Sequence, residues 1–207
     1  AVLAITLLAC AIAVVAALLA QLLVASLAFV TNLAFYGRVS LEEVSPAGNA
    51  LGGWVVLVPI VGALLVGVMA RYGSAAIRGH GIPEAMEQVL FNRSRIPARV
   101  LLLKPLSAVI SIGTGGPFGA EGPIIATGGA LGSLVGQYTR ISADERKTLL
   151  AAGAAAGMSA IFGSPVAAVL LAIELLLFEY RARSVIPVAL SAVTAAGVRV
   201  AFVGTAP

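Results

Sequence analysis

Apolar residues along this chain form several long runs separated by short polar links. The first run, residues 2–36, contains no charged side chain and is followed by a polar link over Gly37–Asn49. A second run, Leu51–Ala70, ends before the basic residues Arg71 and Arg78. About 20 helical residues cross a hydrocarbon core of about 30 Å, so each run predicts a membrane-spanning helix. The first would measure roughly 50 Å, and we expect it to tilt steeply or protrude.

The rest of the chain consists of shorter apolar runs at Pro83–Phe91, Val100–Ile112, Pro123–Tyr138, Thr148–Phe162 and Val166–Phe178, and of the run Ser184–Val203, which is long enough to span once more. Two breaks interrupt them. Five glycines and two prolines occupy the eleven residues 113–123, and Gly163-Ser164-Pro165 forms the second break. Backbone groups exposed to hydrocarbon cost several kcal/mol each unless they line a cavity or find partners, so paired broken helices favour a transporter. We therefore predict an all-α, polytopic membrane protein with about eight tilted or broken transmembrane helices.

Composition supports a membrane location, because 60% of the 207 residues are hydrophobic and only 11% are charged. The formal charge of +4 comes from basic residues in the links, so nucleic acid is not an expected partner and the lipid bilayer is. The positive-inside rule places the segment Arg71–Lys104 and the turn at Arg181 and Arg183 in the cytoplasm. The single cysteine, Cys10, lies in an apolar run, so neither a disulfide nor a thiolate metal site is expected. We expect a multi-pass protein of a cell membrane, a bacterial inner membrane, without cofactor or metal.

Two glycine segments each precede a proline at a helix start, Gly79-His80-Gly81-Ile82-Pro83-Glu84 and Gly119-Ala120-Glu121-Gly122-Pro123. A helix N-terminus carries about half a positive elementary charge and several unpaired N–H donors. Two such termini aimed at one point would bind a small anion without a buried lysine or arginine. Weak binding of this kind is what conduction requires. The sequence therefore predicts a site for chloride or a similar anion.

Two carboxylates stand out within these apolar surroundings. Glu121 lies on the rim of the second glycine segment, where it can compete with the anion or protonate and move away. The alternative is that Glu121 only stabilises the helix terminus. Glu174 lies in an otherwise apolar stretch and is either a functional acid or the partner of an arginine. His80 is interpreted as a hydrogen-bonding turn residue rather than a switch, and the runs Gly128–Gly132 and Ala151–Gly157 as close helix contacts.

These segments resemble motifs of the CLC chloride channels and chloride/proton exchangers. Gly79–Glu84 is similar to that family's GSGIPE, Gly119–Pro123 to its G(K/R)EGP, and Gly153–Gly157 with Gly163–Ala168 to its GAAAG and AP(L/I)xG. The similarity runs from about Arg78 to Val203. It implies a fold of two inverted repeats per subunit and a homodimer with separate pores. Residues 1–207 would then be the first repeat, without the second repeat that completes the pore, and this part alone should not conduct.

The resemblance also implies roles for individual residues. It assigns anion binding to Gly79, His80, Gly81, Ile82, Pro83, Gly119, Ala120, Glu121 and Gly122. Glu121 matches the gating glutamate, which implies voltage- or pH-dependent gating. His80 stands where serine is usual and Ala120 where lysine or arginine is usual. Glu174 matches the first of two adjacent acids and is the proton-transfer candidate, whereas Leu175 replaces the second, the internal proton acceptor.

An apolar residue at that position favours a chloride channel over a coupled exchanger. Four alternatives remain, two within the family and two outside it. The chain can be a chloride/proton antiporter, with protons as a second partner, or a fluoride-selective member. Other classes are an intramembrane hydrolase using His80 and Ser164, and a non-transporting membrane scaffold. We expect transport rather than catalysis, with no catalytic residues.

Overall fold

The computed structural model describes residues 2–74, 77–79, 81–139 and 141–204, and within them the fold is all-α without β-strands. His80 therefore lies outside the described residues. The α-helices are α1 (Val2–Tyr36), α2 (Leu57–Val68), α3 (Ile82–Phe91), α4 (Ala98–Gly113), α5 (Glu121–Tyr138), α6 (Ala143–Phe162), α7 (Pro165–Ala172) and α8 (Ala182–Val203). Short 3₁₀ turns, Pro46–Gly48 and Gly52–Val56, precede α2, and π-helical turns, Met69–Gly73 and Ile173–Leu177, follow α2 and α7. The predicted fold class is confirmed.

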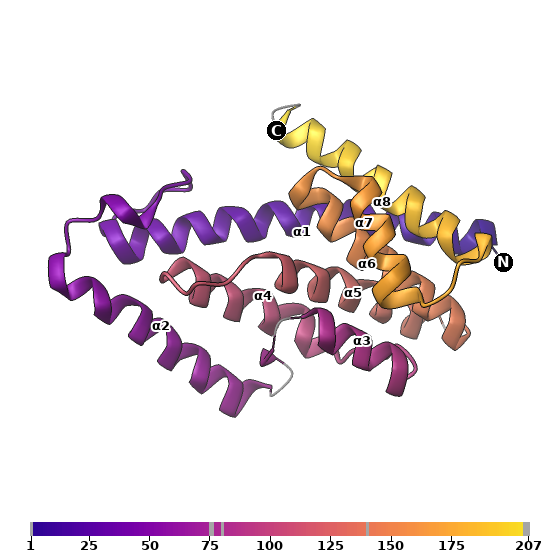
Figure 1. The fold of residues 1–207 in the computed structure, drawn as a ribbon, viewed down its shortest axis with the longest axis horizontal. Helices are drawn as coiled ribbons and strands as arrows, with labels where there is room; N and C mark the ends of the chain where they lie inside the picture. Colours follow the sequence, from indigo (N-terminus) through magenta and orange to yellow (C-terminus); the bar gives the residue numbers. More distant parts are fainter. Residues whose placement is uncertain (1, 75–76, 80, 140, 205–207) are drawn as a thin grey trace.

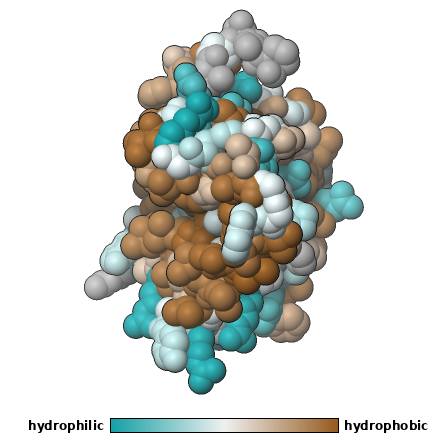
Figure 2. All heavy atoms as spheres, turned by 90° about the vertical axis from the view of Figure 1, so that its left-hand side faces the viewer, coloured by the Kyte–Doolittle hydropathy of each residue, from teal (hydrophilic) through white to brown (hydrophobic). Residues whose placement is uncertain are grey.

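Helix α1 runs along the whole molecule, and α4, α5, α6 and α8 pack against it, whereas α2 diverges from the other helices (Figure 1). Of the residues in α2, only Gly62 is buried. Helix α1, the continuous helical segment Gly52–Gly73 and residues Ala182–Phe202 of α8 are long and apolar enough to cross a membrane. Apolar surface also dominates the centre of the end where α1 finishes and α2 begins (Figure 2). Such a surface fits a lipid environment.

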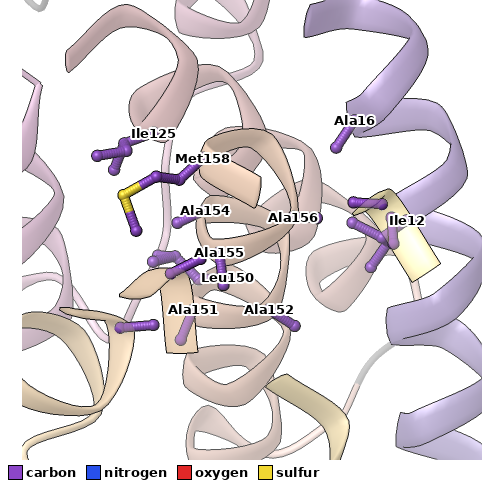
Figure 3. Packing of buried hydrophobic residues seen from close by; sticks show 14 of the residues in the cluster. Ile12, Ala16, Ile125, Leu150, Ala151, Ala152, Ala154, Ala155, Ala156 and Met158 are labelled. Atoms are coloured by element: carbon purple, nitrogen blue, oxygen red, sulfur yellow. The ribbon is translucent and has the colours of Figure 1, made fainter. Parts of the chain in front are cut away.

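The core lies around α6, whose small residues allow α1, α5 and α8 to approach closely (Figure 3). A Cβ atom added at Gly128 of α5 would overlap the carbonyl group of Gly153 in α6, and the reverse also holds. The predicted small-residue contact is thus confirmed. Helices α6 and α8 are joined by two buried hydrogen bonds, in which Ser159 Oγ donates to Ala192 O at 2.7 Å and Ser191 Oγ to Ala152 O at 2.9 Å.

Two helices begin earlier than the sequence pattern predicted. Helix α6 starts at Ala143 rather than Thr148, because Ser142 Oγ accepts from the Glu145 amide and Glu145 Oε2 accepts from the Ser142 amide. This reciprocal cap extends the helix toward its N-terminus, into a polar stretch that the sequence pattern predicts as a link. Helix α5 starts at Glu121, so Pro123 occupies its first turn, where a missing N–H is tolerated. The first break is correspondingly shortened to residues 114–120.

The N-terminal ends of α1, α6 and α8 lie together at one end of the molecule. They line one open cavity of about 210 Å³, with Val2, Ile5, Ser142, Asp144, Glu145, Thr148, Arg183 and Ser184 as its lining. The α3–α4 link reaches the same end, because Arg146 Nε and Nη2 donate to Arg93 O at 2.9 and 2.7 Å. Basic residues of two separate links, which the positive-inside rule had placed on one side, therefore occupy the same end of the structure.

Candidate anion site

The loop before α3 depends on two glycines with positive φ angles, 93° at Gly79 and 98° at Gly81. A Cβ atom at Gly79 would overlap the carboxylate of Glu84, which folds back over the loop. Glu84 Oε2 accepts a hydrogen bond from the Gly81 amide at 2.6 Å. Ile82 and Pro83 form the first turn of α3, where the ring of proline is readily accommodated. The GIPE sequence thus builds a helix start whose leading amide is already occupied.

Lys104 of α4 also holds this loop, a role that the sequence analysis missed. Its side chain is buried, and Nζ donates to Ile77 O at 3.0 Å and to Gly79 O at 2.9 Å. A buried ammonium group needs such acceptors, because losing water without them is costly. The available signal was a single charged residue within Val100–Ile112. Lys104 thus places a buried cation next to a site that the sequence predicted to need none. Its ammonium group contacts the loop carbonyls.

The second glycine segment opens α5 with amides that have no acceptor among the described residues. Ala120 is the N-cap residue and its carbonyl accepts from the Ile124 amide at 3.1 Å, without a side-chain cap. The amides of Glu121 and Gly122 belong to the first turn, which lacks intrahelical acceptors. The Glu121 side chain is exposed and lies near Gly119, with its carboxyl carbon 3.8 Å from the position of a Cβ atom there. Glu121 therefore lies on the rim of this terminus, as predicted.

The two glycine segments, about 40 residues apart in the sequence, meet through their backbones. A Cβ atom at Gly81 would overlap the carbonyl group of Gly122. The N-termini of α3 and α5 consequently lie against each other, whereas their convergence on one anion stays a prediction. In this structure the Gly81 amide donates to Glu84 Oε2 and is therefore not free for an anion. Among the described residues, the unpaired donors of the site come mainly from the α5 terminus.

A small cavity of about 40 Å³ lies beside this contact. Its walls come from α3, α4, α5 and the α3–α4 link and comprise Gly81, Glu84, Ala85, Gln88, Ile96, Pro97, Val100, Lys104 and Ala126. Glu84 and Lys104 thus face one space with opposite charges. A cavity of this size with polar groups in its wall can hold a water molecule.

Glu174 lies apart from the glycine contact, in the π-helical turn Ile173–Leu177 that packs against α3. Its side chain is exposed, whereas Leu175 is half-buried. π-Helical turns within membrane and soluble helices occur frequently at functional sites. Ser164, the nucleophile of the hydrolase interpretation, begins α7 at the second break. Because His80 lies outside the described residues, no geometry of a Ser–His pair supports that interpretation.

Comparison with known proteins identifies the family. The family model described as voltage gated chloride channel matches residues 61–207, well over half of the chain. This chain belongs to the CLC family. That family consists of channels and transporters rather than enzymes.

Relatives of known name fall on both sides of the channel–exchanger distinction. The chain is 32% identical over 152 residues to a putative chloride channel protein ClcB-like of Ralstonia nicotianae, covering 71% of this chain and 35% of that protein. It is 36% identical over 160 residues to the H(+)/Cl(-) exchange transporter ClcA of Vibrio campbellii, covering 73% and 33%.

A solved structure of a slow cyanobacterial Cl-/H+ antiporter matches with a TM-score of 0.66 and 25% identity. That match covers 93% of this chain and 46% of the antiporter chain. The CLC chain described here thus spans about a third of the length of its curated relatives and about half of the solved one.

Proposed function

We propose that this CLC chain contributes one half of a chloride pathway, with the anion bound between residues 79–83 and residues 119–122. The backbone contact of Gly81 with Gly122 carries the proposal, because it brings two helix N-termini together at one point. Their combined partial charge attracts an anion while leaving it weakly held. A second repeat supplies the remaining ligands in the complete protein, which we expect to be a homodimer in a cell membrane.

Charges around the contact of Gly81 with Gly122 support the binding of an anion rather than a cation. The ammonium group of Lys104 lies behind the Gly79 carbonyl and adds positive potential to this region. Glu84 offsets part of this potential, and its carboxylate accepts a hydrogen bond from the Gly81 amide. Glu121 is the carboxylate next to the free amides of α5. It can occupy them when ionised and release them when protonated, so chloride flux should rise as the pH falls.

The residues favour chloride flux that is weakly coupled, or not coupled, to proton movement. Leu175 carries no titratable group at the position that the family resemblance gives to the internal proton acceptor. The names of the exchange transporter and antiporter relatives favour the alternative, in which Glu174 passes protons. Simultaneous recording of chloride and proton movement separates the two. Uphill proton transport driven by a chloride gradient would establish the exchanger and refute the channel.

The gate is tested by Glu121→Gln in the complete natural protein, reconstituted in chloride-loaded liposomes. The amide mimics the protonated carboxyl, so the variant should conduct at neutral pH at the rate that the wild type reaches only in acid. Glu87→Gln is the matched control, because Glu87 is exposed on α3 and should leave flux and its pH profile unchanged. Wild-type flux and pH dependence in E121Q would refute the gate. Liposomes that retained chloride with the wild-type protein would favour a scaffold.

A further inference from the structure

Three guanidinium groups gather where the α3–α4 link meets the start of α6. Arg146 is buried, and its Nε and Nη2 atoms both donate to the carbonyl oxygen of Arg93. Arg95 lies close enough to Arg146, as does Arg93, for their charges to repel it. Arg93 and Arg95 are themselves exposed. The fold thus concentrates positive charge at one place on the surface.

The link that carries these arginines is fixed in place by hydrogen bonds. Arg93 and Ser94 have positive φ angles of 51° and 58°, a conformation that costs about 1 kcal/mol or more for residues other than glycine. Ser133 of α5 holds the link, since its Oγ donates to Ser94 O at 2.6 Å and accepts from the Ile96 amide at 2.9 Å. The arginines are therefore presented on a rigid turn.

The charge of this cluster is not neutralised by acidic side chains of the described residues. Ion pairs within the described part of the chain join Arg181 to Glu179 and Arg183 to Asp144, and neither involves the cluster. Like charges placed together destabilise a fold unless an anion joins them. An anion from outside the chain would remove this repulsion.

Arg93 and Arg95 border an open groove of about 580 Å³, which we call the arginine groove. It is lined by Gln88, Phe91, Asn92, Arg93, Arg95 and Pro97. Its wall combines guanidinium groups and side-chain amides with the ring of Phe91, which is 79% exposed. Arginine binds phosphate oxygens through two parallel hydrogen bonds. An exposed aromatic ring beside such donors suits a ligand with a phosphate and an apolar part.

The position of the groove identifies the kind of ligand. Arg146 connects it to the end of the molecule where the membrane-crossing helices α1 and α8 begin. Helices of this length and composition place that end near a membrane surface when they span it, and the excess of basic residues favours the cytoplasmic leaflet, which is rich in anionic lipid. We propose that the arginine groove binds the phosphate headgroup of an anionic phospholipid, with Phe91 against the first carbons of its chains.

The test is a binding titration of the purified complete protein in detergent, followed by native mass spectrometry. Phosphatidylglycerol, phosphatidylcholine and inorganic phosphate are the probes. Arg93→Gln with Arg95→Gln removes two charges from the groove and should weaken phosphatidylglycerol binding about 10- to 30-fold. The matched control, Arg181→Gln with Arg183→Gln, removes two exposed charges from the same end and should change it less than about twofold.

Each outcome decides the proposal. Tight binding of phosphatidylglycerol, weak binding of the other two probes and a selective loss in the groove variant support it. Equal binding of phosphatidylcholine shows that headgroup charge is not recognised, and equally tight binding of inorganic phosphate shows a free-anion site. Equal losses in both double variants show a general effect of charge. Any of these three results overturns the proposal. The unfolding temperature of R93Q/R95Q should equal that of the wild type, because the carbonyl of residue 93 still accepts from Arg146. An equal temperature excludes misfolding as the cause of weaker binding.

Discussion

The two glycine–proline breaks of this chain have opposite surroundings, although their compositions are similar. At the break between α6 and α7, Gly163 caps α6 with a φ of 64° and the guanidinium group of Arg199 lies beside it. A Cβ atom there would be 3.0 Å from Arg199 Nη1. At the break between α4 and α5, Ala120 provides no side-chain cap and Glu121 is exposed. We call the α6–α7 break the covered break, because the charge of Arg199 lies beside it, and the α4–α5 break the open break, because no side chain caps the start of α5.

The polarity of the exposed helix ends explains this difference. The C-terminal end of α6 presents carbonyl oxygens, which an arginine of the same chain stabilises. The N-terminal end of α5 presents amides, and the backbone of Gly81 lies against it instead of an acidic cap. A helix break in a membrane protein is thus a candidate site only where its polar groups are left unsatisfied by the chain. The following changes test that distinction, in order of expected effect.

Lys104→Met should have the largest effect, because it leaves the carbonyls of Ile77 and Gly79 without their donor. A buried acceptor without a partner costs about 1–3 kcal/mol, and Ile77 is buried whereas Gly79 is exposed, so we expect the free energy of unfolding to fall by about 1–3 kcal/mol. Chloride binding should weaken with it, because the loop loses its support. Thermal unfolding in detergent and chloride titration measure the two effects.

Lys147→Met is the matched control, since Lys147 is half-buried and contacts the Phe178 ring at 6.0 Å. Loss of that contact should cost less than about 1 kcal/mol and leave chloride binding intact. Equal stability of K104M and K147M would show that Lys104 does not support the open break.

Gly81→Ala should disrupt the open break directly. The φ of 98° is unfavourable for alanine, and the new Cβ atom would push against the Gly122 carbonyl. A strained backbone of this kind costs about 1–3 kcal/mol, so chloride should bind about 10- to 100-fold more weakly. Gly67→Ala in α2 is the control, because its Cβ atom meets nothing within 4 Å. Chloride affinity in G81A equal to that in G67A would place the anion elsewhere.

Sequence reasoning predicted the elements well and the contacts less well. The bounds of α1, residues 2–36, and both breaks follow from local composition, because charge, glycine and proline act on their own segment. The start of α6 was missed although Ser142 and Glu145 form a capping pattern visible in the sequence. The occupied amide of Gly81 was missed in the same way, because Glu84 lies three residues after it in a second capping pattern. The contacts of Lys104 could not be predicted, because they depend on which segments meet after folding.

Arg199→Gln tests the covered break and should have a smaller effect. The arginine stabilises the carbonyl end of α6, an interaction worth about 0.3–1 kcal/mol, so the unfolding midpoint should fall slightly. Chloride flux and its pH profile should match those of the wild type, because this break does not face the proposed pathway. A change in flux as large as that of E121Q would show that both breaks line the pathway, and the comparison between them would be wrong.

Ser184→Ala addresses a second carboxylate near a helix start, which contrasts with Glu121. The hydroxyl of Ser184 donates to Glu179 Oε1 at 2.6 Å, and this hydrogen bond, with nearby Lys147, Arg181 and Arg183, lowers the pKa of Glu179. A depressed carboxyl pKa stabilises the fold above the pKa of the unfolded chain, and that stability is lost as the pH falls through the folded value. The S184A variant should raise the pKa of Glu179 toward its ordinary range and flatten the acid limb of stability, as carboxyl NMR titration and unfolding at pH 3–6 measure. An unchanged Glu179 titration would mean that the basic side chains alone hold this carboxylate, whereas Glu121 has the free α5 amides beside it.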